Sequence, residues 1–259
     1  MTNHTTEELL AILDQPTDVG TNGNRIESER RYAAMTLGTV KDPAVVPPLL
    51  ERLKAETPGC GVHETLTWAT VQHIDTALPD VLAMLTDADP HLRRTGAHIL
   101  SKVGDPAHLE HVAPLVDDSD WDVALKAYRA VANAGGEQAD VAACALAGRL
   151  GSGDALQKDA LTTALQTLGA VAVPALVKAL ADTDAEVREH AADALGHLGE
   201  EAAPAVDALA DLAADPEASV RLSAVAALGQ LGETAQPALQ RLTGSSDPTV
   251  AAVARRFVA

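Results

Sequence analysis

A segment of about thirty residues recurs along this chain, and that repetition limits its fold more than any other feature. The two clearest copies are VREHAADALGHLG, which begins at Val187, and VRLSAVAALGQLG, which begins at Val220. In both copies a basic residue follows the valine, and these two residues, Arg188 and Arg221, stand 33 positions apart. The pattern predicts one small structural unit that is stacked many times.

The same register extends through most of the chain. We call the residue after the valine the ladder position; it is occupied by Arg30, His63, Arg93, Ala124, Lys158, Arg188, Arg221 and Ala251. The register predicts seven repeats, near residues 26–57, 60–89, 90–120, 121–154, 155–184, 185–217 and 218–247, and a terminal half repeat at 248–259.

Residues 1–25 precede the repeats. They are expected to form a capping helix, whose Leu9, Leu10 and Leu13 cover the open apolar end, and a flexible loop from Pro16.

Each repeat contains two apolar patterns of helical period, such as Ala191, Ala194, Leu195 and Leu198. Aromatic residues make up only 2% of the chain, which favours closely packed helices over sheets. Asp-Pro pairs at Asp42, Asp89, Asp105, Asp215 and Asp247 are typical helix starts, and Gly104, Gly169, Gly199 and Gly232 are typical helix ends. The predicted repeat is therefore helix, turn, helix, turn.

This pattern resembles the HEAT-repeat family, in particular the short repeats of the phycobilisome-lyase type, over about residues 26 to 259. The resemblance implies an all-α, right-handed α-solenoid of about seven helical hairpins with capping helices at both ends. It also implies that the first helix of each hairpin lies on the convex side and the second lines the concave side. Scaffolds, lyases, hydroxylases and glycosylases all use this fold, so it does not identify a function.

The basic residues of the ladder are expected to be structural. Arg188 and Arg221 are predicted to bind loop carbonyls or an Asp of the neighbouring repeat. The same role is expected of Arg30, Arg93 and Lys158.

The net charge of −18 disfavours a nucleic-acid partner, because such binding depends on Lys and Arg. A protein or peptide partner with basic residues is expected instead. The chain has no leader-like N-terminus and no run of about 18 apolar residues, so we expect a cytoplasmic monomer with no membrane contact. Cys60 and Cys144 are expected to be reduced thiols, and no cofactor is expected.

One surface line departs from the repeat pattern. The solvent-facing position held by Asp193 is occupied in other repeats by Met35, Trp68, His98, Arg129 and Thr163. Exposed large apolar residues often mark binding surfaces, so Met35, Trp68, His98 and Arg129, together with His63, are our candidate partner-binding residues. Alternatively, the N-terminal helix or a loop folds over Trp68.

Histidines concentrate in the second and third repeats. Residue types suited to zinc or iron occur there at Cys60, His63, Glu64, His73, His91, His98, His108 and His111. His63 and His73 are about 15 Å apart along one predicted helix and cannot share an ion. We therefore expect no metal site, with His63 as a ladder substitute, His73 at a buried leucine position and the others on solvated faces.

The fourth repeat is irregular because Ala124 replaces the ladder base and Trp121 precedes it. Glycines at 135, 136, 151 and 153 flank its second helix. These features predict a locally altered curvature.

No catalytic motif stands out. Deoxyhypusine hydroxylases, which the repeats distantly resemble, use paired His-Glu dipeptides; here only His63-Glu64 matches, and Glu189-His190 is reversed. The sequence therefore favours a non-enzymatic protein-interaction scaffold or adaptor, which binds its partner either in the concave groove of the solenoid or on the patch around Trp68. A lyase or chaperone-type helper that acts on a cofactor-bearing protein is the alternative.

Overall fold

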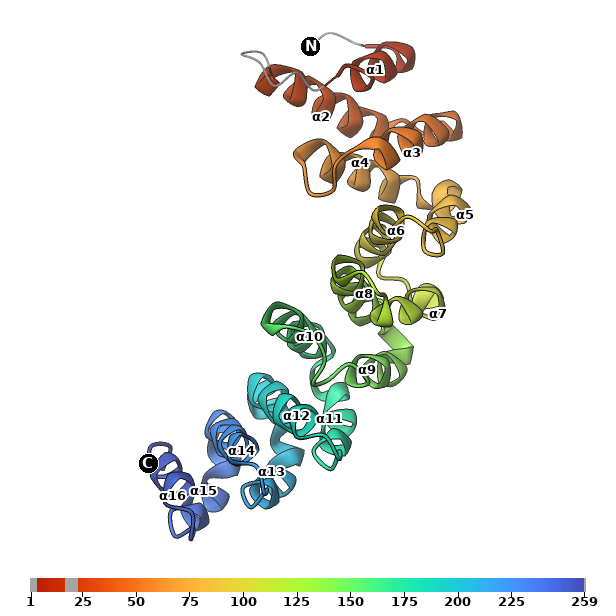
Figure 1. The fold of residues 1–259 in the computed structure, drawn as a ribbon. Helices are drawn as coiled ribbons and strands as arrows, with labels where there is room; N and C mark the ends of the chain where they lie inside the picture. The colour runs from red at the N-terminus through yellow and green to blue at the C-terminus, as the bar shows by residue number, and fades with distance from the viewer. Residues whose placement is uncertain (1–3, 17–22, 259) are drawn as a thin grey trace. The chain divides into compact units, whose positions relative to one another are not determined.

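The computed structural model describes residues 4–16 and 23–258, and all regular structure in these ranges is helical. The chain divides into two compact units, Met1–Gly104 (unit 1) and Asp105–Ala259 (unit 2). Each unit is a stack of helices from successive repeats, so the predicted all-α solenoid is confirmed (Figure 1). The division falls inside residues 90–120, which the sequence assigns to one repeat.

Unit 1 begins with the short helix α1 and continues with helices that alternate between two rows. Its helices are α1 (Thr6–Leu13), α2 (Gly23–Thr39), α3 (Val46–Ala55), α4 (Gly61–Gln72), α5 (Ile74–Met84) and α6 (Pro90–Val103). The ladder positions belong to α2, α4 and α6, which we call first helices; α3 and α5 are second helices. Neighbouring first helices pack against one another, as α2 does against α4.

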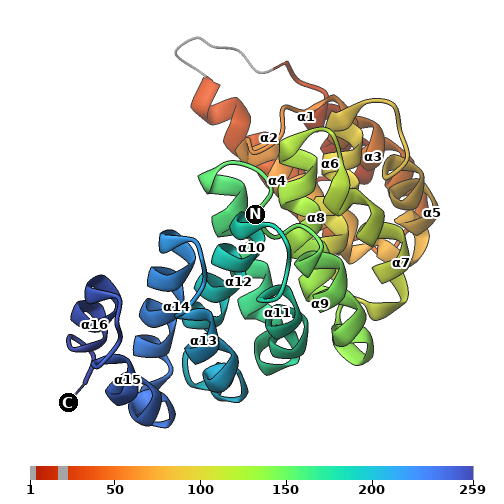
Figure 2. The same cartoon turned by 60° about the horizontal axis from the view of Figure 1, so that its bottom comes forward.

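Unit 2 continues the same alternation. Its helices are α7 (Leu109–Val112), α8 (Trp121–Asn133), α9 (Ala139–Ala147), α10 (Ala155–Leu168), α11 (Val173–Ala179), α12 (Ala185–Leu198), α13 (Val206–Leu212), α14 (Ala218–Gln230), α15 (Gln236–Leu242) and α16 (Pro248–Ala254). Here α8, α10, α12, α14 and α16 are the first helices. They form one row, and the second helices form the other (Figure 2).

The two rows of unit 2 lie on opposite sides of its curve. Figure 1 shows the first helices on the inner side and the second helices on the outer side. The expectation that first helices lie on the convex side is therefore wrong for this unit. The cause lies in side-chain size: the first helices meet through Gly and Ala, as Gly196 does with Ala227, and small side chains let helix axes approach closely.

Helix boundaries follow the local chemistry of the sequence. The side chains of Asp42, Asp89, Asp105 and Asp247 each accept a backbone N–H two residues further on and so cap a helical segment. Gly104, Gly169, Gly199 and Gly232 all have positive φ, which is the backbone conformation predicted for helix ends.

The N-terminal helix α1 packs on α2. Its start is fixed by a capping box between Thr5 and Glu8, and Leu9 and Leu13 are buried while Leu10 is half-buried. The predicted loop from Pro16 lies largely outside the described residues, which omit 17–22.

The segment Ala155–Ala179 is long enough to match a membrane-spanning helix, and an 18-residue window within it, with a mean hydropathy of 1.6, is apolar enough by composition. Polar side chains interrupt this stretch, and the structure divides it into α10 and α11. Gly169, with φ at 58°, ends α10 before the turn between them. The stretch is therefore one helical hairpin of the stack.

Candidate partner-binding groove

The ladder arginines tie neighbouring repeats of unit 2 together. Nε and Nη2 of Arg188 donate to the two carboxylate oxygens of Asp215 at 2.8 and 2.9 Å, and Nη1 donates to the carbonyls of Asp182 and Thr183. Arg221 repeats this arrangement one repeat later. Its Nε donates to the carboxylate of Asp247 at 2.9 Å, and its Nη1 donates to the carbonyls of Asp215 and Pro216. The guanidinium of Arg188 lowers the pKa of Asp215 by hydrogen bonding.

Two further ladder residues are engaged in a similar way. Lys158 donates to Glu186 of the next repeat at 2.9 Å. In unit 1, Arg93 donates to the carbonyls of Asp87 and Ala88. These cations therefore serve the stack and do not form a basic binding surface.

Arg30 is the most enclosed of the ladder arginines. It is fully buried, donates to the carbonyl of Leu13 at 3.0 Å and forms an ion pair with Glu56. Glu56 also binds Arg52 at 2.7 Å. Arg30 thus joins the capping helix α1 to α2 and to the end of α3.

A groove crosses the first helices of unit 2. One hollow of about 540 Å³ lies between α12 and α14, and another of about 550 Å³ lies between α10 and α12; Asp193 and His197 line both. We call the joined surface the acidic groove. Its remaining lining comes from Ala155, Lys158, Asp159, Thr162, Glu186, Glu189, His190, Gly196, Gly199, Ala226, Ala227 and Gln230.

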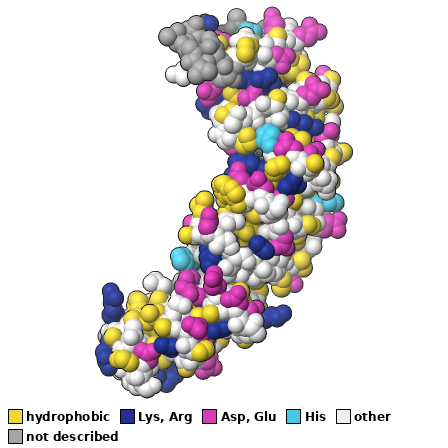
Figure 3. Space-filling view, viewed as in Figure 1, with side chains coloured by type: hydrophobic (Ala, Val, Ile, Leu, Met, Phe, Trp, Pro, Cys, Tyr) yellow, Lys and Arg dark blue, Asp and Glu magenta, His cyan; other side chains and the backbone are white. Residues whose placement is uncertain are grey.

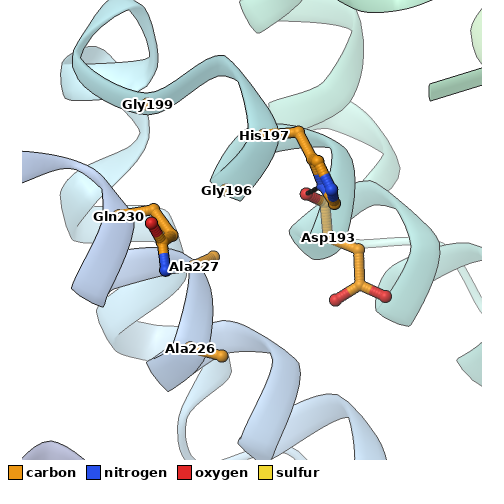
Figure 4. Close-up of a pocket in the computed structure, with 7 residues that line it drawn as sticks. All are labelled: Asp193, Gly196, His197, Gly199, Ala226, Ala227 and Gln230. Atoms are coloured by element: carbon orange, nitrogen blue, oxygen red, sulfur yellow. Dashed lines mark hydrogen bonds between the residues drawn. The ribbon is translucent and has the colours of Figure 1, made fainter. Parts of the chain in front are cut away.

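The α12–α14 part of the acidic groove has polar walls and a floor of small residues. Figure 4 shows Asp193 and His197 projecting from α12 and Gln230 from α14, with Ala226 and Ala227 near them. His197 is oriented by a hydrogen bond between its Nδ1 and the carbonyl of Asp193, at 2.9 Å. A Cβ on Gly196 would lie 3.1 Å from the Cα of Ala227, so the two helices touch at the floor of the groove.

Carboxylates dominate the electrostatics of the groove. Four of its lining residues are acidic, and its one lysine, Lys158, is already paired with Glu186. Desolvation by the surrounding helices raises the pKa of Asp193, and the nearby charge of Glu189 raises it further. Figure 3 shows Asp and Glu side chains gathered over the α10 and α12 part of unit 2.

The charge of the whole chain is also concentrated in unit 2. Residues 105–259 contain 23 of the 37 acidic residues but only 10 of the 19 basic ones. The groove therefore lies on the more acidic of the two units, where a cationic ligand gains most from the local potential.

His190 lines the acidic groove and connects α12 to α10. Its Nδ1 accepts a hydrogen bond from the backbone N–H of Gly151 at 3.1 Å, so Nε2 carries the proton. Nε2 lies 3.1 Å from the carbonyl of Lys158 and 3.0 Å from Oγ1 of Thr162. Burial lowers the pKa of this histidine, which holds α12 to α10 in its neutral form.

The structure separates the candidate partner-binding residues into exposed and buried ones. Met35 and Trp68 are 53% and 38% exposed on α2 and α4 of unit 1, and Arg129 is exposed on α8 of unit 2. Trp68 also packs on Gly38, where a Cβ would come within 2.7 Å of its ring. Partner contact at these three residues stays a prediction.

The placement of His98 and His63 on a partner-binding surface is wrong. His98 is only 6% exposed, because its Nε2 binds both carboxylate oxygens of Glu64 at 3.1 Å and its ring stacks on that of His63. His63 is completely buried between α4 and α6. Neither imidazole can reach a partner in this structure.

The other metal-ligand candidates are dispersed. Within the described ranges, no three His, Cys, Asp or Glu side chains converge as a metal site would require. Nε2 of His73 lies 3.0 Å from the carbonyl of Leu37, and Nε2 of His91 lies 3.0 Å from that of Lys54, so His91 is also not on a solvated face as predicted. His108 and His111 belong to unit 2.

Sequence reasoning did not find the acidic groove. It identified Asp193 only as one member of a surface line. Glu189 stands directly after the ladder residue, as Asp159 does one repeat earlier, and this recurrence of carboxylates at one register position was the available signal.

Comparison with known proteins identifies the repeat. The HEAT repeats family matches residues 63–132 and 173–258, which together make up more than half of the chain. This chain is a HEAT-repeat protein. Residues 29–55 match the PBS lyase HEAT-like repeat, in agreement with the short repeat length. No curated protein matches this HEAT-repeat chain.

Solved structures agree on the fold. One comes from work on microtubule plus-end tracking by XMAP215, CLIP-170 and EB1; it is 16% identical, with a TM-score of 0.57 over 69% of this chain and 88% of that chain. Crescerin, described as using a TOG domain array to regulate microtubules in the primary cilium, is 15% identical, with a TM-score of 0.54 over 70% and 88%. The CpcE and CpcF complex of phycocyanin lyase from Nostoc sp. PCC7120 is 22% identical over 100% and 96%, with a TM-score of only 0.41. At these identities the similarity concerns the HEAT-repeat fold alone.

Proposed function

We propose that this HEAT-repeat protein is an interaction scaffold that binds a basic segment of a protein partner in the acidic groove of unit 2. The observation that carries the proposal is the distribution of charge. The ladder arginines of unit 2 are turned into the stack and paired with Asp215 and Asp247, whereas Asp159, Glu189 and Asp193 line the groove.

The shape of the groove suits long cationic side chains. Gly196, Ala226 and Ala227 leave a low floor between α12 and α14 on which an aliphatic stem can lie. Asp193 and Gln230 then offer oxygen acceptors to an ammonium or guanidinium head. Binding is expected to weaken with added salt, because charges at the rim of an interface are screened.

The experiment measures binding of fluorescent Lys- and Arg-containing peptides and of matched acidic peptides to the purified chain. The test variant neutralises the groove with Asp159→Asn, Glu189→Gln and Asp193→Asn. We expect this variant to bind the basic peptides about tenfold more weakly or worse, a loss of about 1.4 kcal/mol.

A second triple variant controls for net charge. It carries Glu137→Gln, Asp207→Asn and Glu233→Gln, which remove the same number of exposed carboxylates from unit 2 outside the groove. The control should bind like the unmodified chain. An equal loss in both variants, or no preference for basic peptides in the unmodified chain, would contradict the proposal.

The exposed apolar residues Met35 and Trp68 provide a second contact surface in unit 1. If a partner that binds the acidic groove also covers this surface, Trp68→Ala should weaken its binding by more than about tenfold, as truncation of a buried interfacial aromatic does. Titration calorimetry with the intact partner measures this. Val141→Ala, at an apolar residue that is 51% exposed on α9, is the control truncation, and an equal loss there would argue against a contact at Trp68.

The alternative function, a lyase or chaperone-type helper for a cofactor-bearing protein, makes a different prediction. Chain purified from its source should then carry a chromophore or a stoichiometric metal, which absorption spectroscopy and metal analysis would detect. The distribution of charge favours the scaffold.

A further inference from the structure

Helices α4 and α6 of unit 1 enclose three histidines that the proposed function does not use. The ring centroid of His63 lies 6.5 Å from that of His98, with the rings nearly parallel, and 6.3 Å from that of His91. His63 comes from α4 and the other two from α6, so the three rings span the junction between successive first helices.

The hydrogen bond of the His63 ring places a proton on its Nε2. Oγ1 of Thr95 donates its proton to the carbonyl of His91 at 2.9 Å, so it accepts from Nε2–H of His63 at 3.3 Å. Nδ1 of His63 is buried and meets no hydrogen-bond partner among the residues that the structure describes. The nearest carboxylate oxygen is Oε1 of Glu64, 4.0 Å away, which is too long for a hydrogen bond.

The charges around His63 act in both directions: Glu64 favours a proton on the imidazole, whereas its cationic neighbours oppose it. Glu64 is engaged with His98 at 3.1 Å and with Lys102 at 3.8 Å. The positive charge of Arg94, and of His91 and His98 once protonated, would repel an imidazolium at His63. Further charged groups belong to the neighbouring elements. On α2, α3, the turn after α3 and α5 they are Arg25, Glu27, Glu29, Arg30, Arg31, Glu51, Arg52, Lys54, Glu56, Asp75 and Asp80. Among these, Arg30 and Arg52 form ion pairs with Glu56.

We infer that the α4–α6 junction is an acid-labile joint, at which protonation of His63 separates the two helices locally before the rest of the chain unfolds. A proton on Nδ1 would have no hydrogen-bond acceptor among the described residues, so the imidazolium is accommodated only when His63 is exposed to water. This step requires no ligand and does not depend on the proposed function.

The direction of the pH dependence follows from linkage. Burial lowers the pKa of His63 from 6.5 to about 4, with the charge of Arg94 adding to the effect and Glu64 opposing it. The opened state therefore binds a proton more readily than the closed state. The contribution of His63 to stability is complete above pH 6.5 and is lost as the pH falls toward about 4.

Hydrogen exchange followed by mass spectrometry tests the inference, with rates corrected for the intrinsic effect of pH. Between about pH 7 and about pH 5, the opening constant of peptides from α4 and α6 should rise about twentyfold in the unmodified chain. Peptides from α14, which contains no histidine, provide the internal reference. In His63→Leu the rise should be absent, and in His111→Leu, which changes an exposed histidine, it should persist.

An equal rise in His63→Leu, or no rise in the unmodified chain, would overturn the inference. If His63→Leu does not fold, an NMR titration of the unmodified chain decides the matter. The chemical shift of the ring C–H protons of His63 should keep the value of a neutral imidazole until α4 and α6 lose protection from hydrogen exchange. Titration near pH 6.5 with both helices still protected would also overturn the inference.

Discussion

Replacing Arg30 with Met is expected to lower the free energy of unfolding of unit 1 by about 3–5 kcal/mol. The substitution leaves Glu56 almost completely buried with one of its two cationic partners removed, because only Arg52 remains. It also removes the donor to the carbonyl of Leu13, so α1 should lose protection from hydrogen exchange together with α2. Chemical denaturation of the intact chain, followed by a probe in unit 1, gives the measurement.

Two variants make the Arg30 result interpretable. Arg30→Lys keeps the positive charge but loses the planar guanidinium, which donates to both Leu13 and Glu56. We therefore expect it to lower the free energy of unfolding by less than Arg30→Met does. Arg30→Met combined with Glu56→Gln removes the buried charge along with its partner and should recover part of the stability. If the double variant is no more stable than Arg30→Met, the cost does not arise from the unpaired carboxylate.

Replacing Leu165 with Ala should cost about 3–5 kcal/mol in unit 2. Leu165 is completely buried in the last turn of α10, where truncation leaves a cavity among side chains of the neighbouring helices. Because a solenoid's stability is a sum of repeat and interface terms, the loss of protection should be largest in α8, α10 and α12 and smaller in α16. Hydrogen exchange resolves these helices separately.

Thr163→Ala is the matched control for Leu165→Ala. Thr163 lies on the exposed face of the same helix, and its hydroxyl bonds only to the carbonyl of Asp159. We expect a change within about 0.5 kcal/mol. A large effect at Thr163, or a uniform loss of protection across unit 2 in Leu165→Ala, would contradict the nearest-neighbour description.

Local chemistry made the fold predictable from the sequence. Asp42 and Asp247 precede proline and cap helices as their positions predict, and Gly104 adopts the positive φ expected of a helix end. Each of these features depends on a few consecutive residues. The curvature of unit 2 depends instead on how large the facing side chains of successive repeats are, which is why the side assigned to the first helices was wrong.

The candidate site was less predictable because it depends on contacts between repeats. His98 occupies a register position that faces solvent at Asp193, but Glu64, 34 residues earlier, draws its imidazole inward. Lys158 and Arg188 stand at equivalent positions, yet only the structure shows that both are paired and leave Asp159, Glu189 and Asp193 as the groove's charged lining. Pairing of this kind is a property of the stack and not of any single repeat.

The ladder of unit 2 has a consequence for how such a chain can change in length. Asp215 receives Arg188 from the first helix of its own repeat and the backbone N–H of Glu217, just before α14, and Asp247 does the same with Arg221 and with Thr249 at the start of α16. Each aspartate thus closes one repeat and starts the next. Duplicating residues 188–220 would supply one ladder arginine together with its paired aspartate and leave no partner missing, whereas an insertion between Arg188 and Asp215 that is not a whole repeat would separate that pair. Growth by whole repeats is therefore the least disruptive way for this chain to lengthen.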